Sequence, residues 1–433
     1  MSGCEGIELR PLDRPDPLAD PSLSRELAQR FCLFDPFVGG QRRVDLHPLW
    51  LDRASHERAV AAAEGVARVV DAVGSGALDD EEEAAHYGLP EEVRRLARAS
   101  FQAKDRASLV RVDLLLDETG TFRVCEINAD CPGGQNEATA LPWLARRAGF
   151  SAGRDPNTVL DALAERVIAL ASRGGEPRAI GLLHATGYAE DLQVCALLQR
   201  ALARRGARAL LAPPTAPSLR GGALHLWGQE LGAVYRFFPI EGMEGQRNVE
   251  GYIEAVGSGQ LRSMSSFAQI YAQSKVSMAR AWAQLGGLAP ADQELIERHL
   301  PLTLALREVP AAALVADRRG WVLKRGLGRV GEQVFVGDLH EDPEWAEIVI
   351  EVMALELAGE PWIAQRYVPQ RPIPTPWGPR LLTLGVYVQD GQFTGYFARL
   401  TPRSHVSHDA LCVPVFIEPA EAPAPALSLE VPA

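Results

Sequence analysis

The chain has 433 residues, and 47% of them are hydrophobic, enough to build a sizeable core divided among several subdomains. Its 44 lysines and arginines are outnumbered by 56 acids, and the net charge of -12 argues against a general nucleic-acid binder, whose affinity comes from neutralising phosphates. No apolar run approaches the length that a bilayer requires, so we expect no membrane span and no membrane partner.

The two ends of the sequence contain little that predicts regular structure. Residues 1–25 are rich in Pro and Asp and predict an irregular lead-in, and the first twelve residues lack the basic and apolar regions of a secretory signal. The Pro- and Ala-rich tail, residues 418–433, is expected to lack a core contact. The six cysteines, at 4, 32, 125, 131, 195 and 412, form no CxxC pair. They are typical of reduced thiols, and we predict a cytoplasmic protein.

Helical patterns precede the most informative segment of the chain. Ala and Val recur with helical spacing from His56 to Val73, and a further helix is expected to start near Pro90, a residue suited to a first helical turn. Residues 26–150, which include both helices and the segment that follows, are predicted to form one unit of the fold.

The segment Arg111 to Glu137 (RVDLLLDETGTFRVCEINADCPGGQNE) predicts a β-hairpin, because apolar residues alternate on both sides of a DETG turn. Side chains alternate between faces along a strand, so Glu126 and Asn128 point the same way, and the fold-back brings Asp113 beside them. Three oxygen ligands, two of them anionic, suit a hard cation such as Mg²⁺. The alternative is a surface hairpin with solvated acids. In the metal-site interpretation, Gly133-Gly134 forms a loop where a substrate could approach the backbone.

Residues 151–265 predict a small αβ subdomain. A helix is expected to start near Asn157 and Thr158, followed by an apolar strand over 179–184, a helix over 190–205 and a second strand over 207–212. Residues 233–239 are expected to add another strand to the same small parallel sheet. Arg236, near the end of that strand, could reach a substrate in the crevice at the carboxyl edge of the sheet. A salt bridge to one of the many acids explains it equally well.

Residues 266–417 predict a nucleotide-binding unit. A helix over 269–285 carries Lys275, and a short strand ending at Lys324 leads into the glycine-rich RGLGRVG. This GxGxxG (Gly326, Gly328, Gly331) is followed by a strand, not a helix, so it does not fit the dinucleotide fingerprint. A glycine-rich hairpin tip can instead cover phosphates with its backbone N–H groups, with Lys324 as a charge partner. A flexible hairpin with no ligand is the alternative.

The remaining elements of this unit are a helix over 342–357, a strand over 362–368 and a hairpin formed by 381–388 and 393–400. Arg399 stands near the end of that hairpin.

Together these motifs resemble the ATP-grasp carboxylate–amine ligases, specifically the circularly permuted kind that includes the glutathionylspermidine synthetases. In the usual ATP-grasp order the lysine-bearing strands come first and the Asp…Glu-x-Asn metal strands last. Here Asp113, Glu126 and Asn128 come first. The resemblance covers residues 45–417 and implies a mixed α/β (α+β) ATP-grasp fold in permuted order.

The resemblance also implies roles for individual residues. Arg111 matches the family's arginine two residues before the metal aspartate, and Arg399 matches a phosphate-facing arginine; both would be catalytic. Lys275 and Lys324 match the ATP lysines. The strand that meets adenine would be WIAQRYV, around Gln365, Arg366, Tyr367 and Val368.

The function implied is an ATP- and Mg²⁺-dependent ligase that joins a small-molecule or peptide carboxylate to an amine through an acyl phosphate. The chain shows no hydrolase module ahead of the ligase region, and Cys131 stands where relatives carry a small polar residue, so the family's substrates are not carried over. Two alternatives stay open. One is a cysteine amidohydrolase using Cys131 with His405 or His408. The other is a scaffold that keeps the fold without ATP turnover.

Overall fold

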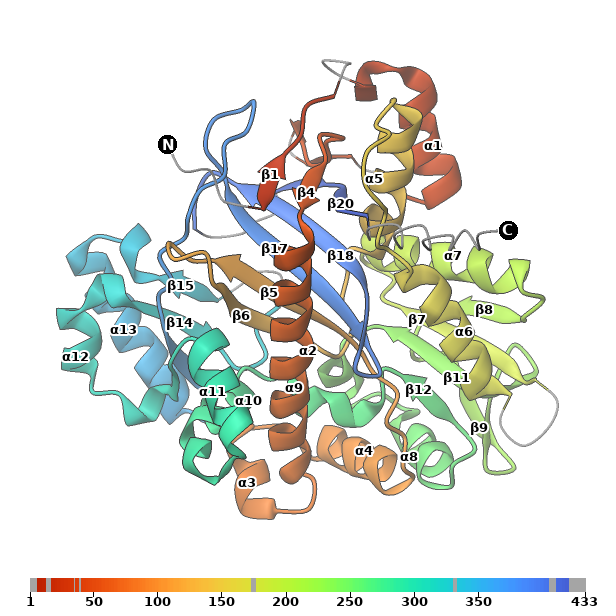
Figure 1. Ribbon diagram of the computed structural model, residues 1–433. Coiled ribbons are helices and arrows are strands. Elements are labelled where there is room, and N and C mark those ends of the chain that lie inside the picture. The colour runs from red at the N-terminus through yellow and green to blue at the C-terminus, as the bar shows by residue number, and fades with distance from the viewer. Residues whose placement is uncertain are drawn as a thin grey trace, which may run out of the picture.

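The computed structural model describes residues 6–12, 17–34, 36–38, 40–172, 177–329, 333–404 and 410–419. The predicted mixed α/β class is confirmed, with several sheets and helices between them. Figure 1 shows the central sheet with α2 (Arg53–Gly76) lying across it, a smaller unit of β14, β15, α12 and α13 on one side, and the small αβ sheet on the other. Among the described residues, no helix is long and apolar enough to cross a membrane.

The central sheet is antiparallel throughout and has the strand order β19-β18-β17-β5-β6. Its strands are β5 (Leu109–Leu116), β6 (Phe122–Asn128), β17 (Leu381–Gln389), β18 (Gln392–Thr401) and β19 (Leu411–Val413). The predicted hairpin is therefore confirmed as β5–β6, with Gly120 at φ +81° in its turn. The hairpin over 381–400 is confirmed as β17–β18.

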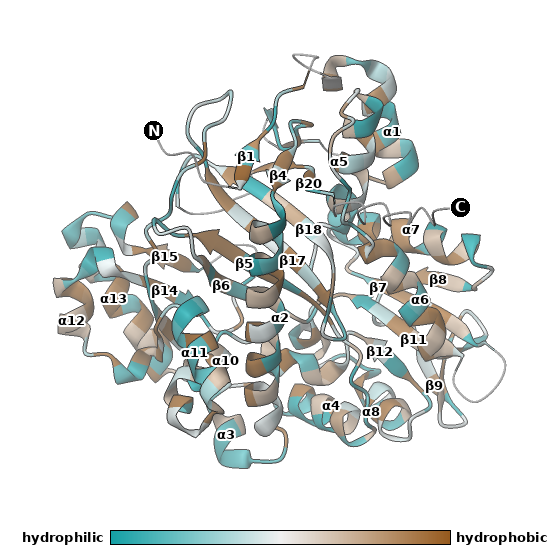
Figure 2. Ribbon diagram, viewed as in Figure 1, coloured by the Kyte–Doolittle hydropathy of each residue, from teal (hydrophilic) through white to brown (hydrophobic). Residues whose placement is uncertain are grey.

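Helix α2 covers one face of this sheet because small residues recur along one of its sides. Ala59, Ala63, Val66 and Val70 are all fully buried and belong to the same core as Val112 and Leu114 of β5. Figure 2 shows hydrophobic and hydrophilic residues alternating along α2, as expected of a helix buried on one side only. The predicted helix over 56–73 is confirmed and extends by three residues at each end, with the Asp52 side chain capping its N-terminus.

The small sheet has the order β8-β7-β11-β10-β9, with β12 also paired to β11. Its strands are β7 (Ala179–His184), β8 (Ala209–Ala212), β9 (Ser218–Arg220), β10 (Ala223–Leu226), β11 (Gln229–Phe237) and β12 (Arg262–Met264). Strands β7, β8, β11 and β12 are parallel, which confirms the predicted parallel sheet. It packs with α6 (Val159–Ala171) and α7 (Ala189–Arg204).

The third sheet has the order β13-β16-β14-β15, with strands β13 (Thr303–Ala305), β14 (Trp321–Arg325), β15 (Val334–Val336) and β16 (Trp362–Arg366). It shares a core with α12 (Ala311–Ala316) and α13 (Asp342–Leu357). Strands β14 and β15 are antiparallel, so the predicted glycine-rich hairpin tip joins them.

The remaining helices and strands pack around these three sheets. The other helices are α1 (Pro21–Phe31), α3 (Glu81–Ala85), α4 (Glu91–Gln102), α5 (Gln135–Arg147), α8 (Val249–Gly257), α9 (Ile270–Gln273), α10 (Val276–Ala283) and α11 (Pro290–His299). Strands β1 (Ile7–Leu9), β4 (Leu49–Leu51) and β20 (Val415–Ile417) form a three-stranded sheet, and β2 (Phe37–Val38) pairs with β3 (Gln41–Arg42).

Two predictions about local structure are wrong in part. The lead-in is not irregular where it is described, because Ile7–Leu9 pairs with β4, and α1 starts at Pro21 with the Asp20 side chain accepting from Ser22 N. At the other end, Glu418 is exposed and its N–H donates to Leu51 O at 2.9 Å; the residues from 420 onward lie outside the described ranges, and the expectation for the tail stays a prediction.

The expected helix over 269–285 is divided into α9 and α10 at Ser274-Lys275. There the backbone N–H of Lys275 donates to Gly326 O at 2.8 Å and not to a carbonyl of its own helix. Since a helix gives up an internal hydrogen bond where another segment supplies the acceptor, the break reflects the docking of the glycine-rich loop at Lys275.

Candidate functional site

The predicted metal residues share one face of hairpin β5–β6. Asp113 and Glu126 are direct register partners, and Arg111 is paired with Asn128. Residues two apart on a strand point to the same face, so these four side chains gather together. Asn128 Nδ2 donates to Asp113 Oδ2 at 3.4 Å. The structure therefore brings together all three residues that the sequence predicted as metal ligands.

Two arginines neutralise Asp113. Arg111 donates from Nε to Oδ1 at 2.7 Å and from Nη2 to Oδ2 at 3.0 Å, and Arg399 donates from Nη2 to Oδ2 at 2.6 Å. Burial alone would raise the pKa of Asp113, but the two guanidinium groups lower it to about 2. Asp113 therefore remains an anion across the neutral pH range.

A glycine allows Arg399 to reach Asp113 from two strands away. Arg399 lies on β18, and Gly385 of the intervening β17 is the register partner of Asp113. A Cβ at Gly385 would lie 2.9 Å from Arg111 Cδ and 3.1 Å from Asp113 Oδ1. Any larger residue at this position would crowd the ion pair, so the small residue keeps the path across β17 open.

Two buried lysines complete the cluster. Lys275 Nζ lies 2.8 Å from Glu126 Oε1 and donates to Gly328 O at 2.8 Å. Lys324 Nζ donates to Cys125 O at 2.8 Å and to Gln365 Oε1 at 2.7 Å. Burial opposes ionisation of Glu126, yet the neighbouring Lys275 keeps the pKa of that carboxyl below its usual value. Burial also lowers the pKa of the Lys324 ammonium.

The cluster has more positive than negative charge. Two carboxylates, Asp113 and Glu126, lie among four cationic groups: Arg111, Arg399, Lys275 and Lys324. All of these side chains are wholly or largely withdrawn from solvent, with Glu126 the most exposed at 27%. Excess positive charge in a buried site, where the dielectric constant is low because water is excluded, favours the binding of a multiply charged anion.

The oxygen donors of Asp113, Glu126 and Asn128 fit the chemistry of Mg²⁺. Both oxygens of Asp113 already accept guanidinium N–H groups, so a cation would take the place of Arg111 or Arg399 there. Over the described ranges, no group of three or more His, Cys, Asp or Glu side chains is arranged to hold a metal, and the ligand set of Asp113, Glu126 and Asn128 stays a prediction.

Only part of the predicted adenine strand faces this cluster. Gln365 is buried, accepts from Lys324 and donates to Thr303 Oγ1 at 3.0 Å. Arg366 instead pairs with Asp317 and stacks over the Trp321 ring. The remaining two residues follow β16, which ends at Arg366, two residues before the predicted end of the strand: Tyr367 N donates to Gly320 O at 3.0 Å, and Val368 is half-buried.

The glycine-rich loop contacts the cluster through carbonyl groups. Gly326 O accepts from Lys275 N, and Gly328 O accepts from Lys275 Nζ, each at 2.8 Å. Gly331, the third glycine of the motif, lies outside the described residues. We refer below to the described segment Gly326–Arg329 as the glycine loop.

The Gly133-Gly134 loop also reaches the cluster. Gly133 O accepts from Arg111 Nη1 at 2.9 Å and from the Tyr387 hydroxyl at 2.5 Å. Gly134 precedes α5 at φ +93°, and a Cβ there would lie 2.8 Å from the Phe397 ring, so only glycine fits. Arg236, the third predicted substrate residue, is fully buried and forms an ion pair with Asp130.

Sequence reasoning missed Asp130 and Arg329, which form a second ionic cluster beside the first. The signal for Asp130 was present, because it continues the every-second-residue series of Glu126 and Asn128. Arg329 was treated only as a position between two glycines of the motif. Tyr387 was also missed, since a tyrosine in an apolar strand is usually interpreted as a residue of the hydrophobic core.

Cys131 lacks the environment of a nucleophile. Burial raises the pKa of its thiol to about 12, although Arg329 Nη1 lies 3.3 Å from Sγ. A thiol with such a pKa is protonated at neutral pH and reacts poorly. His405 and His408, its proposed partners, lie outside the described residues.

We therefore expect Cys131→Ser to keep any ATP-dependent turnover, and iodoacetamide at pH 8 to label Cys131 far more slowly than a free thiol in a peptide. Peptide mapping by mass spectrometry measures the labelling. Rapid, selective alkylation of Cys131 together with loss of activity in the serine variant would instead support the hydrolase alternative.

The chain is similar to a known protein family over most of its length. The family described as glutathionylspermidine synthase preATP-grasp matches residues 47–418. A glutathione synthetase-like effector from Globodera pallida, solved in its apo form, aligns with 93% of this chain and 98% of its own, with a TM-score of 0.60 and 12% identity. At that identity the likeness shows the fold alone.

A putative γ-glutamylcysteine synthetase from Methylobacillus flagellatus aligns with 79% of this chain and 84% of its own, with a TM-score of 0.42 and 14% identity. Among curated protein sequences, none matches significantly. The family match covers most of the chain, including every described residue of the charged cluster, and the chain therefore belongs to the glutathionylspermidine synthase preATP-grasp family.

Proposed function

We propose that this protein is an ATP- and Mg²⁺-dependent ligase that joins a carboxylate to an amine and releases ADP and phosphate. The observation that carries the proposal is the charge of the buried cluster, where four cationic side chains surround two carboxylates. A triphosphate is an anion of the kind such a cluster favours, and membership of a synthetase family points to small-molecule substrates.

The residues divide the work by charge. Lys275, Lys324 and Arg399 would offset the negative charge of the distal phosphates, and Asp113, Glu126 and Asn128 would hold Mg²⁺. The metal supplies Lewis-acid stabilisation of the phosphoryl oxygens. Arg111, held between Asp113 and Gly133 O, would stabilise charge at the reacting centre. Positioning and charge are sufficient for this chemistry, without a covalent bond to the protein.

The order of the motifs supports a permuted form of the fold. The metal hairpin precedes Lys275 and Lys324 in the sequence, yet it is the neighbour of β17 in the central sheet. We infer that the usual ATP-grasp order has been rearranged with the contacts of the site retained. The domain boundaries at residues 25, 150, 265 and 417 are part of the same proposal.

The products provide the first test. The substrate carboxylate should attack the γ-phosphorus to give an acyl phosphate, because we propose that the two lysines bind the distal phosphates, with the glycine loop beside Lys275. Attack by the amine on the acyl carbon then expels phosphate, which keeps one oxygen of the original carboxylate. We expect ¹⁸O from a labelled carboxylate to appear in inorganic phosphate, measured by mass spectrometry in a screen of amino acids, peptides and polyamines.

Label in AMP, or pyrophosphate among the products, would contradict the acyl-phosphate route. Nucleotide binding without turnover for any acid and amine pair would favour the scaffold alternative.

A further inference from the structure

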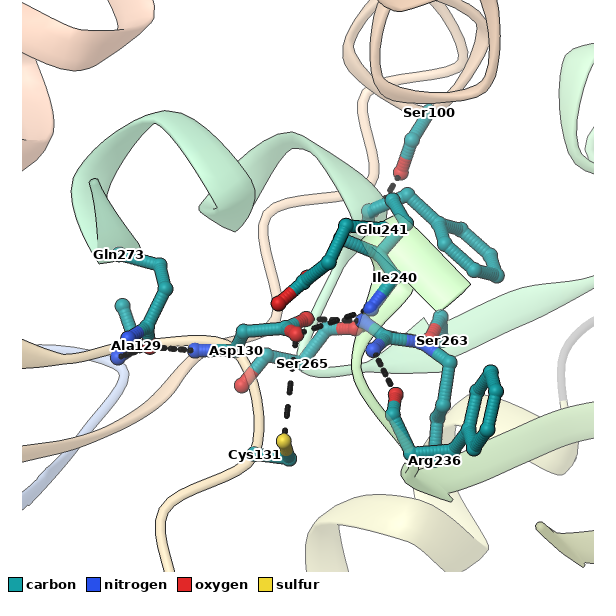
Figure 3. A network of polar contacts seen from close by, with 12 residues as sticks. Ser100, Ala129, Asp130, Cys131, Arg236, Ile240, Glu241, Ser263, Ser265 and Gln273 are labelled. Carbon is teal, nitrogen blue, oxygen red and sulfur yellow. Dashed lines mark hydrogen bonds and ion pairs between the residues drawn. The ribbon is translucent and has the colours of Figure 1, made fainter. Parts of the chain in front are cut away.

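The second ionic cluster is centred on Asp130, the residue two positions beyond Asn128. Its carboxylate is buried, accepts from Ile240 N at 3.1 Å and lies 2.6 Å from Arg236 Nη2. Its own N–H donates to Gln273 Oε1 at 3.0 Å. Figure 3 shows Asp130 between Gln273 on one side and Arg236 with Ile240 on the other. Through its backbone N–H and its carboxylate, Asp130 thus joins the end of the metal strand to two other segments.

Arg329 connects the glycine loop to this cluster. It donates from Nη2 to Asp130 Oδ2 at 2.7 Å and to Glu241 Oε2 at 2.7 Å, and from Nε to Glu241 Oε1 at 2.6 Å. Its third nitrogen, Nη1, lies 3.3 Å from Cys131 Sγ. All the guanidinium nitrogens are therefore engaged by residues outside the loop.

The loop is attached at two places that differ in kind. Its beginning is fixed by backbone bonds, from Gly326 N to Pro361 O and from Lys275 N to Gly326 O, each 2.8 Å. Its end is held by side chains, through Lys275 Nζ on Gly328 O and through Arg329. Lys275 is a proposed phosphate ligand and would turn to the nucleotide, so Arg329 is the contact that can persist in both states.

Charge distinguishes an anchoring role for Arg329 from a phosphate-binding one. Asp130 and Glu241 match Arg236 and Arg329 in number, so this cluster has no excess positive charge. The cluster around Asp113 has such an excess. A balanced, hydrogen-bonded set of charges gains little from a further anion, whereas it fixes the groups that compose it.

We propose that Asp130 is a positioning residue that anchors the glycine loop, Gly326–Arg329, in its observed position through Arg329. In this position Gly328 lies beside Lys275, next to Glu126. The anchor is a property of the free protein; its consequence for nucleotide affinity rests on the function proposed above. A loop that is already held in place loses less conformational entropy when a ligand binds.

Trypsin measures the anchor directly, because it must bind the Arg329 side chain to cut after it. Arg325 is an internal reference, since its Nε pairs with Glu360 at 3.1 Å, away from Asp130. In Asp130→Asn we expect single-hit cleavage after Arg329 of the ligand-free protein, relative to that after Arg325, to rise on the order of tenfold, as a charged hydrogen bond is lost. Glu360→Gln is the matched control and should raise cleavage only after Arg325.

A second variant guards against misfolding, because Asp130→Asn leaves two guanidinium groups with weaker partners. Glu241→Gln changes only the outer partner, whose side chain is 28% exposed, and keeps the Asp130–Arg236 pair. We expect a smaller rise in cleavage after Arg329 with an unchanged circular dichroism spectrum. An unchanged Arg329-to-Arg325 cleavage ratio in the folded variants would overturn the anchor.

Calorimetric titration with a non-hydrolysable ATP analogue and Mg²⁺ tests the consequence. A higher dissociation constant in Asp130→Asn or Glu241→Gln, alongside faster cleavage, supports the positioning role. Faster cleavage with unchanged affinity would overturn that role. Faster cleavage in a protein whose wild type binds no nucleotide would leave the anchor standing and contradict the proposed function instead.

Discussion

Glu126→Gln is expected to remain folded and to lose ATP-dependent turnover by about a hundredfold at limiting magnesium, since altering even the partners of metal ligands costs about 10- to 100-fold in metal affinity. Glutamine keeps an oxygen that can accept from Lys275, so the buried ammonium retains a hydrogen bond. What it removes is one of the two negative charges in a cluster of four cations. The variant should recover part of its activity at high magnesium if the loss lies in metal affinity.

The measurement is ADP release as a function of magnesium concentration at saturating ATP. Glu118→Gln is the matched control, because Glu118 is exposed at the turn of the same hairpin and the charge change is identical. Wild-type turnover in Glu126→Gln at limiting magnesium would contradict the metal assignment. Equal losses in both variants would point to the net charge of the protein and not to the site.

Lys324→Met is expected to weaken nucleotide binding by roughly 10- to 150-fold, the equivalent of about 1.5–3 kcal/mol for a charged hydrogen bond. The free protein should lose little stability. Its fold gives up the bonds from Nζ to Cys125 O and Gln365 Oε1, but it no longer carries an ammonium that burial disfavours, as the lowered pKa of Lys324 shows. The substitution should therefore lower the affinity for nucleotide while leaving the stability of the free protein nearly unchanged.

Calorimetric titration with a non-hydrolysable ATP analogue measures the first quantity and thermal unfolding the second. Arg325→Met is the matched control: it removes one positive charge from the next residue of β14, whose side chain points the other way and is 41% exposed. An affinity for Lys324→Met equal to that of the control would mean that Lys324 does not face the phosphates.

The sequence predicted the hairpin and its acids because their periodicity is local. Alternation fixes which side chains share a face of β5 and of β6, and the turn fixes the register, so Asp113 and Glu126 could be placed together without knowledge of the rest of the fold. The same holds for the parallel strands of the small sheet and for α13, each of which has an apolar pattern with clear ends.

What could not be predicted depends on contacts between distant segments. The helix breaks at Lys275, where the backbone N–H donates to the carbonyl of Gly326, and no residue near Lys275 in the sequence predicts this hydrogen bond. Arg399 meets Asp113 only because β17 lies between them and carries Gly385. The Asp130–Arg329 pair likewise joins residues 199 positions apart. The periodicity of a sequence indicates which side chains share a face of one helix or strand. Which distant residue a side chain will contact depends on the tertiary fold.

The position of β5 in the central sheet also orders events during synthesis. Strand β5 pairs on one side with β6, its neighbour in sequence, but on the other side with β17, which follows after both the small sheet and the third sheet. In a nascent chain, the edge of β5 that faces away from β6 therefore stays unpaired until residues 381–389 leave the ribosome. All strands of the small parallel sheet are synthesised much earlier, so this sheet can form before the central sheet. The charged cluster is complete only after the central sheet has formed, because Arg399 lies on β18.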